Sequence, residues 1–453
     1  MKKTIALALT CVMTTGIFFS PAHAILDFKN KKQKAEKQTI LDWVNYDWWK
    51  QQNDLILESY ISRAINNNHD IKTAQLKVEQ ANINVLATKS NQLPSFSIGA
   101  SPLLGKFPGQ TKSTGSFAIP LIASYELDIF GKNANKTKAS KKMLESAQYQ
   151  NQVSDIAIVS MVGTVYYNIV KLDKIISLQE DLVKNREEIY NLMKISNNEG
   201  ISSTSDLILA EKNFVLAQND LIDYKKAREN ALNSLAVLIG DSPNNKVEYQ
   251  RISLDELSND FNIPSEISSE IITNRPDYKA LEKQLESAGL DIRIARKEFL
   301  PTIDILGLLT FVSTSNASSM SFENALGLAG ANAMLPIFTG FQRIANLKMS
   351  KNVYAQLLEQ YQKTNLVAMQ EVNDSLYNLK SSKEKLDNNQ KAYEIQKQDY
   401  KMSSLKFEQG VISKLDLLQQ NEALLFIEQL NANSKIDCYI DKIGLYKATG
   451  AKI

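Results

Sequence analysis

Cysteine and histidine are nearly absent from this chain, whose 453 residues include two of each. Beyond the first 24 residues only Cys438 and His69 remain, so no intrachain disulfide can form and no transition-metal site is expected. A glycine-rich phosphate loop, a paired-histidine helix and a serine–histidine–aspartate set are also missing from the sequence. We therefore expect no metal, no cofactor and no enzymatic activity.

A strong excess of charge of either sign is absent as well, because 52 basic residues stand against 50 acidic ones. A nucleic-acid-binding protein needs a basic face, so we expect no nucleic acid as partner. Beyond residue 24, no apolar run approaches the ~20 residues that a membrane-spanning helix requires. If the protein meets a membrane, the sequence predicts that it does so with β-structure.

Residues 1–24 have the features of a secretory signal peptide. Two lysines precede a mostly apolar stretch, and Ala22-His23-Ala24 is a small-x-small cleavage site. Cleavage at Cys11 to give a lipoprotein is the alternative, but Thr10 stands where such a site usually has alanine or glycine. Residues 25–53 follow as a polar and then aromatic segment, whose tryptophans are expected to pack on helices or at a membrane surface.

The sequence repeats itself with an offset of about 210 residues, which is far too long for a solenoid unit. The corresponding pairs are Asp70 and Asp277, Pro94 and Pro301, Tyr167 and Tyr377, Gly200 and Gly410, Asp206 and Asp416, and Gly240 and Gly450. Because the offset drifts so little along the chain, an internal duplication is favoured. We predict a first structural repeat at 54–250, a connector at 251–267 and a second repeat at 268–453.

The periodicity of the sequence changes after Pro94 and Pro301. After each proline, apolar residues alternate with small or polar ones, which is typical of a membrane β-strand and also of an ordinary soluble hairpin. We predict one β-hairpin at 94–130 with a loop at 102–115, and a second at 301–338 with a loop at 313–321.

Helices are predicted for most of the remaining chain. In the second repeat, apolar residues recur every seven positions at Val372, Leu379, Leu386, Tyr393, Tyr400 and Phe407. An unbroken repeat of seven indicates helices that supercoil around neighbours, and at 1.5 Å per residue each such helix is roughly 100 Å long. The predicted helices are 54–91, 132–196 and 205–239 in the first repeat, and 268–299, 341–407 and 414–449 in the second.

Four strands cannot close a membrane barrel by themselves. An open sheet would expose unpaired backbone groups to lipid, and closed membrane barrels begin at about eight strands. Several chains must therefore share one barrel, and three chains would supply twelve strands. The long helices would continue that barrel as a tube, so the pattern predicts a conduit.

Three features of the sequence resemble the TolC-type outer-membrane efflux protein family, across nearly the whole mature chain. They are the segment Tyr125–Lys132, the pairs Leu93-Pro94 and Leu300-Pro301, and the hairpin glycines followed six residues later by Asp206-Leu207 and Asp416-Leu417. Trp48-Trp49 and Asn68-His69-Asp70 also resemble the branch that serves resistance-nodulation-division pumps.

The resemblance implies an α+β membrane protein of the Gram-negative outer membrane that extends into the periplasm. It implies a homotrimer with a twelve-stranded transmembrane β-barrel and a periplasmic α-barrel of long antiparallel helices. The expected partners are a periplasmic adaptor, outer-membrane lipid, and an inner-membrane transporter of the resistance-nodulation-division, ABC or major facilitator type. The expected function is a passive exit duct for drugs or other small molecules in a tripartite efflux pump. A type I protein-secretion channel and a periplasmic coiled-coil adaptor or scaffold are the alternatives.

The resemblance also places a candidate gate at the hairpin ends of the helices. In the family these ends form the periplasmic entrance and are narrowed by acidic rings, and the matching positions here are Asp206 and Asp416. Gln419 stands where a second acid is common, so the ring is expected to be weaker. Phe407 stands where a tyrosine is common, so it is expected to pack without donating a hydrogen bond.

A structural role for the same acids is the competing interpretation. Ser203 and Ser413 each precede an acid by three residues, which is the spacing of a helix capping box. Gly200 and Gly410 are expected to supply the left-handed turn after a long helix. The strand–helix junctions are predicted at Pro94, Pro301, Gly131 and Gly340.

Overall fold

The computed structural model of the chain describes residues 54–105, 114–243, 248–259, 261, 263–264, 267, 270–314 and 325–450. The predicted signal peptide at 1–24, with Cys11, and the aromatic segment at 25–53 lie outside the described residues. The chain divides into two units, Met1–Gln51 and Gln52–Ile453, and all the described elements belong to the second.

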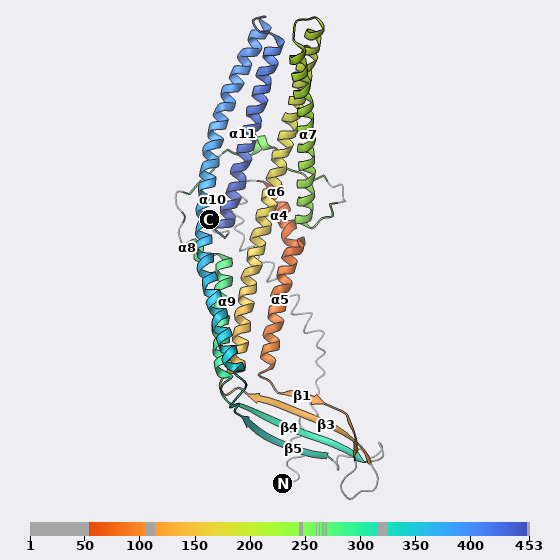
Figure 1. Cartoon of the computed structure of the whole chain (residues 1–453), viewed down its shortest axis with the longest axis vertical. Coiled ribbons are helices and arrows are strands. Elements are labelled where there is room, and N and C mark those ends of the chain that lie inside the picture. The colour runs from red at the N-terminus through yellow and green to blue at the C-terminus, as the bar shows by residue number, and fades with distance from the viewer. Residues whose placement is uncertain are drawn as a thin grey trace. The chain divides into compact units, whose positions relative to one another are not determined.

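Four long helices make up most of this unit (Figure 1). They are α6 (Lys132–Asn198), α7 (Thr204–Ile239), α10 (Gln342–Glu408) and α11 (Lys414–Ala448). Their limits agree with the predicted ones to within two residues. Because α6 packs against both α7 and α11, and α11 packs against α10, the helices stand in the order α7, α6, α11, α10.

The seven-residue spacing marks the buried side of these helices. Val162 of α6 is fully buried, and Leu379 of α10 is nearly so. A second apolar row on α6 includes Leu178 and Leu182, which pack in one cluster with Leu425 of α11. The apolar rows of α6 therefore join the two halves of the chain.

The helix predicted at 54–91 is divided in two, which corrects the sequence prediction. It consists of α4 (Leu55–Asn67) and α5 (His69–Ser90), separated by Asn68 with φ −59° and ψ 133°. The Asn68 side-chain oxygen accepts hydrogen bonds from the Asp70 and Ile71 amides, at 2.8 and 3.2 Å, and so caps α5. Asparagine offers the backbone this alternative to a continuous helix.

The helix predicted at 268–299 is likewise divided, into α8 (Glu270–Asn274) and α9 (Pro276–Lys297). Pro276 occupies the first turn of α9, and the preceding Arg275 is extended with ψ 138°. A proline ring disfavours the helical conformation of the residue before it, so α8 cannot run on into α9.

The strands form one antiparallel sheet at the end of the helices opposite the hairpin turns (Figure 1). They are β1 (Ser95–Ile98), β2 (Ser101–Gly105), β3 (Thr114–Leu127), β4 (Thr302–Thr314) and β5 (Ala325–Met334). The strand order is β1-β3-β4-β5, and β2 also pairs with β3. The two predicted hairpins therefore share a single sheet, because β3 pairs with β4 from Ser116 opposite Thr314 to Leu127 opposite Ile303.

The predicted loops at 102–115 and 313–321 are too long. Residues 102–105 and 114–115 belong to β2 and β3, and residues 313–314 belong to β4. β1 and β2 are separate because of Pro120 in the facing strand. Gly99 donates its amide to the Pro120 carbonyl at 2.9 Å, but Pro120 has no N–H with which to complete the pair.

The expectation that no apolar run is long enough for a membrane-spanning helix is also corrected. Among the described residues, α6 contains an 18-residue window with a mean hydropathy of 1.4 and few charges. Of that window, 61% is buried within the structure. Packing against neighbouring helices therefore accounts for its apolar composition.

The end of α7 lies against the end of α4. Gly240 follows α7 with φ 80°, a conformation that strains any other residue. A Cβ added at Gly240 would stand 2.7 Å from the Asn67 Cβ and 2.9 Å from its carbonyl oxygen. At Gly410, where φ is 72°, an added Cβ would meet nothing within 4 Å.

We expect Gly240→Ala to destabilise the protein more than Gly410→Ala. Both substitutions place alanine at positive φ, at a cost of about 1–2 kcal/mol, but only Gly240→Ala adds a clash with the backbone of α4. Thermal unfolding of the purified full-length variants measures the difference as a larger drop in Tm for Gly240→Ala. Equal midpoints would show that the contact between α4 and α7 relaxes freely.

Candidate functional site

The two helix hairpins turn through glycine. Gly200 follows α6 with φ 70°, and Gly410 follows α10 with φ 72°. In the residue after each glycine, the amide donates back to a helix carbonyl: Ile201 to Ser196, and Val411 to Lys406, both at 2.8 Å. This six-to-one hydrogen bond is the Schellman arrangement, which ends a helix in a tight reversal.

Both return helices begin with a capping box. In the second hairpin, the Ser413 hydroxyl accepts from the Asp416 amide at 3.1 Å and donates to Asp416 Oδ2 at 2.7 Å. The Ser413 amide donates to the same carboxylate oxygen at 2.9 Å. Ser203 and Asp206 make the same three contacts in the first hairpin, at 3.1, 2.7 and 3.3 Å. Both acids are exposed, and each interacts with its own serine.

These hydrogen bonds from the Ser413 hydroxyl and amide lower the pKa of Asp416. A lowered carboxyl pKa stabilises the folded state above the ordinary pKa of aspartate, and the effect disappears as the pH falls through the lowered value. Repulsion among copies of Asp416 in a ring would raise the pKa instead. The capping contacts within one chain therefore favour the charged form that an acidic ring needs.

The two remaining predicted gate residues lie close to Asp416 in the sequence and differ in their contacts. Gln419 is exposed on α11, one turn after Asp416. Phe407 is half-buried near the end of α10, and the Lys414 ammonium lies 5.9 Å from the centre of its ring. Phe407 therefore joins the two sides of the hairpin through a cation–π contact.

Polar contacts between α6 and α11, which the sequence analysis missed, lie beside the hairpins. Arg186 of α6 donates to Glu422 Oε1 of α11 from Nε at 2.9 Å and from Nη2 at 2.6 Å. Its Nη1 donates to the Asn213 carbonyl of α7 at 3.1 Å. One guanidinium group thus ties three helices together.

Asparagine side chains extend this contact. Asn185, which is buried, donates from Nδ2 to the Leu418 carbonyl at 2.9 Å, and Asn421 donates from Nδ2 to Asn185 Oδ1 at 2.9 Å. Asn185 lies seven residues after Leu178, which is a position of the apolar row. A polar residue at such a position fixes the register of packed helices, and this signal could have identified the contact from sequence.

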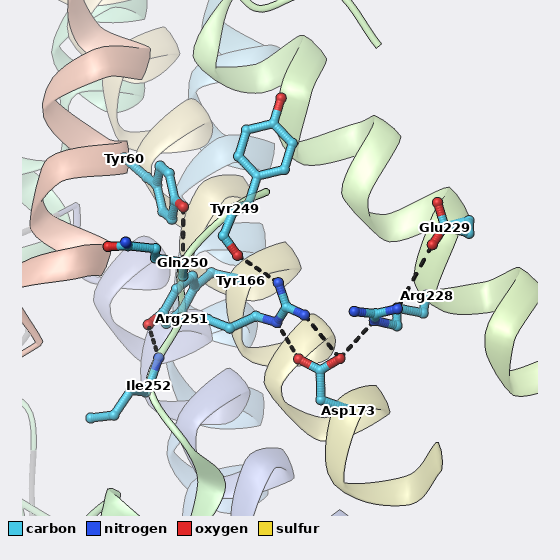
Figure 2. Close-up of polar contacts among 9 residues, drawn as sticks. All are labelled: Tyr60, Tyr166, Asp173, Arg228, Glu229, Tyr249, Gln250, Arg251 and Ile252. Carbon is cyan, nitrogen blue, oxygen red and sulfur yellow. Dashed lines mark hydrogen bonds and ion pairs between the residues drawn. The ribbon is translucent and has the colours of Figure 1, made fainter. Parts of the chain in front are cut away.

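The connector after α7 is held against the helices by charge and by a tyrosine (Figure 2). Arg251 pairs with Asp173 of α6, and Arg228 of α7 reaches the same carboxylate at 2.6 Å. Tyr60 of α4 donates its hydroxyl to the Gln250 carbonyl at 2.8 Å. The Asp173 carboxylate therefore holds the start of the connector against α6 and α7.

The strand–helix junctions have their own backbone chemistry. Gly131 and Gly340 have φ 68° and 60°, and Phe341 also has positive φ, at 67°. The Asp128 carboxylate accepts from the amides of Asn133 and Ala134, at 3.0 and 2.7 Å, and so caps α6. Pro94 and Pro301 each stand directly before a strand, β1 and β4 respectively.

The described residues contain no group of three or more histidine, cysteine or acidic side chains placed to hold a metal ion. Cys438 is buried in α11, and burial raises the pKa of its thiol to about 12. A thiol with so high a pKa is inert at neutral pH. The charged and polar contacts described above lie at helix ends and between helices.

Comparison with known proteins identifies the family to which this fold belongs. The model of the outer membrane efflux protein family matches residues 60–241 and 267–451. The chain is 26% identical over 419 residues to the toluene efflux pump outer membrane protein TtgC of Pseudomonas putida, covering 89% of this chain and 84% of that protein. It is 24% identical over 447 residues to the cation efflux system protein CusC of Escherichia coli, covering 98% and 97%.

Solved structures share the fold. The Campylobacter jejuni CmeC outer membrane channel superposes with a TM-score of 0.81 at 26% identity, over 90% of this chain and 88% of that one. The open-state Neisseria gonorrhoeae MtrE outer membrane channel gives 0.77 at 25% identity, over 88% and 89%. These findings confirm the resemblance seen in the sequence: this chain belongs to the outer membrane efflux protein family and acts in efflux at the outer membrane.

Proposed function

We propose that three copies of this chain form the exit duct of a tripartite efflux pump, with a twelve-stranded barrel in the outer membrane and a tube of helices in the periplasm. The open edges of the sheet support this proposal. In the described chain, β1 and β2 lie at one edge of the sheet and β5 at the other. Unpaired strand edges are costly in lipid, so β5 of one copy is expected to pair with β1 and β2 of the next. Each copy supplies four strand positions, and three copies supply twelve.

Exposed apolar side chains on the strands support a membrane environment. Phe96 and Ile98 of β1 are 71% and 74% exposed, and Leu326 and Leu328 of β5 are 57% and 59% exposed. Apolar surface of this extent marks a membrane or protein contact in a folded protein. Lipid outside the barrel and neighbouring copies at its seams would cover these side chains.

The outer helices of the row support the tube. α7 and α10 stand at its two ends, and both expose large apolar side chains. These include Ile208, Leu216 and Ile222 of α7, and Leu366 and Met402 of α10. Packing α7 of one copy against α10 of the next would bury these side chains and close the row into a ring.

We expect protein from the outer-membrane fraction to have about three chain masses in mild detergent without boiling, because cyclic closure satisfies both the strand edges and the outer helices. Size analysis with light scattering measures the mass. A periplasmic monomer that needs no detergent would contradict both the barrel and the tube.

We also infer that the chain is an internal duplication, with repeats at 54–250 and 268–453 joined by the connector at 251–267. Two observations support this inference. The long helices α6 and α10 both contain 67 residues, and the return helices α7 and α11 contain 36 and 35. Each return helix begins with the same capping box.

The periplasmic entrance is proposed to lie at the two hairpins, where threefold symmetry would repeat Asp416 and Asp206 around the axis. Such rings favour cations. Capping and gating are compatible roles, because the Ser413 contacts favour the charged form of Asp416 and both carboxylates stay exposed. Gln419 adds no charge to the entrance, so the acidic ring would rest on Asp416 and Asp206 alone.

We expect Asp416→Asn to weaken cation block of the reconstituted channel, because it removes three negative charges from the entrance of a trimer. Ser413→Ala is the matched control, since it removes the hydroxyl of the cap and leaves the charge. Single-channel recording with added multivalent cations measures the block. If Ser413→Ala weakens the block as much as Asp416→Asn, or if neither does, Asp416 serves only as a cap.

Opening is proposed to be an iris-like movement of α10 and α11 against α6 and α7. Such a movement would separate α11 from α6, and the Arg186–Glu422 contact opposes it. Phe407 supplies no hydroxyl for a hydrogen bond, so the closed state depends more on this ion pair.

We expect Glu422→Gln to raise the open fraction of the channel about fivefold for each copy that opens, the amount that corresponds to losing one partly exposed ion pair per copy. Glu408→Gln removes the same charge from an exposed position at the end of α10 and serves as the control. Single-channel recording measures the open fraction of both variants. An unchanged open fraction in Glu422→Gln would show that α6 and α11 move together.

Type I protein secretion is the second candidate function. The chain is 25% identical over 399 residues to the toxin and drug export protein A of Aggregatibacter actinomycetemcomitans, whose name includes both kinds of cargo. Co-purification of a drug-pump adaptor or of a secretion adaptor separates the two functions. The third interpretation of the sequence, a periplasmic adaptor or scaffold, does not fit a member of an outer membrane family.

A further inference from the structure

The four connections between sheet and helices all lie at the same end of the helices (Figure 1). Each connection exposes large apolar side chains, which together form an apolar belt. The belt consists of Leu93 in the first connection, Ile129 and Phe130 in the second, Phe299 and Leu300 in the third, and Leu335, Ile337, Phe338 and Phe341 in the fourth. Ile337 is 95% exposed, so nothing in the described chain covers the belt at that point.

Positive charge gathers on the helices directly beyond the apolar belt. Residues 129–144 include five lysines and no acid, and residues 335–358 include one arginine, two lysines and no acid. The ion pairs of this region engage Lys132, Lys142 and Lys283. Exposed basic side chains without an ion-pair partner among the described residues occur here, and we call five of them the cationic belt: Lys138, Lys141, Arg293, Arg296 and Lys348. Lys89 and Lys351 are exposed and unpaired as well.

Three members of the cationic belt lie near the depth of a lipid headgroup layer, while Lys141, nine residues into α6, lies further out at about 14 Å from the helix end. Lys138 and Lys348 lie six residues into α6 and α10, and Arg293 lies four residues before the end of α9. At 1.5 Å per residue, their backbones are about 6–9 Å from the helix ends. The headgroup region extends roughly 5–8 Å beyond the hydrocarbon core, and long cationic side chains reach further toward it.

A groove between α6, α9 and α10 joins the two kinds of surface. Its volume is about 630 Å³, and its walls include Lys138, Lys141, Arg293, Leu285, Leu290 and Tyr354. Glu145, Glu282 and Glu286 also line it. Lys142 pairs with Glu145 at 2.9 Å and with Glu286 at 2.8 Å, and Lys283 pairs with Glu286 at 2.5 Å. The cations Lys138, Lys141 and Arg293 therefore outnumber the remaining acid, Glu282. Free cations beside apolar side chains suit an anionic amphiphile.

We propose that the sheet end of the helices binds anionic phospholipid of the membrane leaflet that faces the periplasm. The apolar belt lies at the interface, and the cationic belt binds the phosphodiester groups. Charge complementarity selects this occupant, since a zwitterionic headgroup offers no net charge to the unpaired cations. The inference rests on the proposed function, because it requires the sheet to span the membrane.

The test compares two triple variants of the full-length protein, each purified from the outer-membrane fraction in neutral detergent. The belt variant is Lys138→Gln/Arg293→Gln/Lys348→Gln. The control, Lys194→Gln/Lys212→Gln/Lys226→Gln, removes the same charge from exposed positions on α6 and α7 away from the sheet. Native mass spectrometry measures bound phosphatidylglycerol and phosphatidylcholine during titration with each lipid.

We expect the wild-type and control proteins to bind phosphatidylglycerol in preference to phosphatidylcholine. The belt variant should bind phosphatidylglycerol on the order of 100-fold more weakly, because each basic residue near an anionic surface contributes about a fivefold factor. Equal binding of the two lipids by the wild type, or equal loss in both variants, would overturn the proposal. It would also be overturned if the belt variant changed only the anion selectivity of the reconstituted channel, since the cations would then line the duct. Recovery of the wild type in the outer-membrane fraction keeps these outcomes separate from failure of the proposed function.

Discussion

Packing on several sides of α6 is the interaction on which the rest of the structure depends. This one helix packs against α4, α5 and α7 from its own half of the chain, and against α9 and α11 from the other half. A helix of 67 residues is stable in water because neighbours cover its apolar rows along its length. The two halves therefore cannot fold apart without exposing α6, and both hairpins are held in one row by the same helix.

Polar residues within that packing decide the register of the helices. An apolar seam alone tolerates sliding by one heptad, whereas Asn185 and the Arg186–Glu422 pair each have one set of partners within reach. If opening separates α11 from α6 as proposed, the contacts that set the register also oppose opening.

The first turns of the helices at the two ends differ in their charged residues. At the hairpin end, α7 and α11 begin with aspartates that complement their N-termini. At the sheet end, the first turns of α6 and α10 contain no acid, and lysines and arginines follow. One pattern suits a cation-favouring entrance, and the other suits a membrane with anionic headgroups. The helices thus bring two different electrostatic environments to the two ends of the proposed duct.

The sequence by itself determined the features that depend on neighbours a few residues apart. The limits of the long helices follow from the seven-residue repeat, and the capping of Asp416 by Ser413 follows from a three-residue spacing. The positive φ at Gly410 follows from the absence of a side chain. Each of these is a local preference of the backbone, so a pattern in the chain predicts it.

Only the tertiary structure decided the features that join distant residues. The pairing of β3 with β4 merges two predicted hairpins into one sheet, and Pro120 divides the strand that faces it. Arg186 meets Glu422 across 236 positions of sequence. The division at Asn68 depends partly on its side-chain amide donating to the Leu238 carbonyl of α7. Such contacts exist only after packing has brought the helices together, because no local periodicity specifies which side chains face each other across two elements.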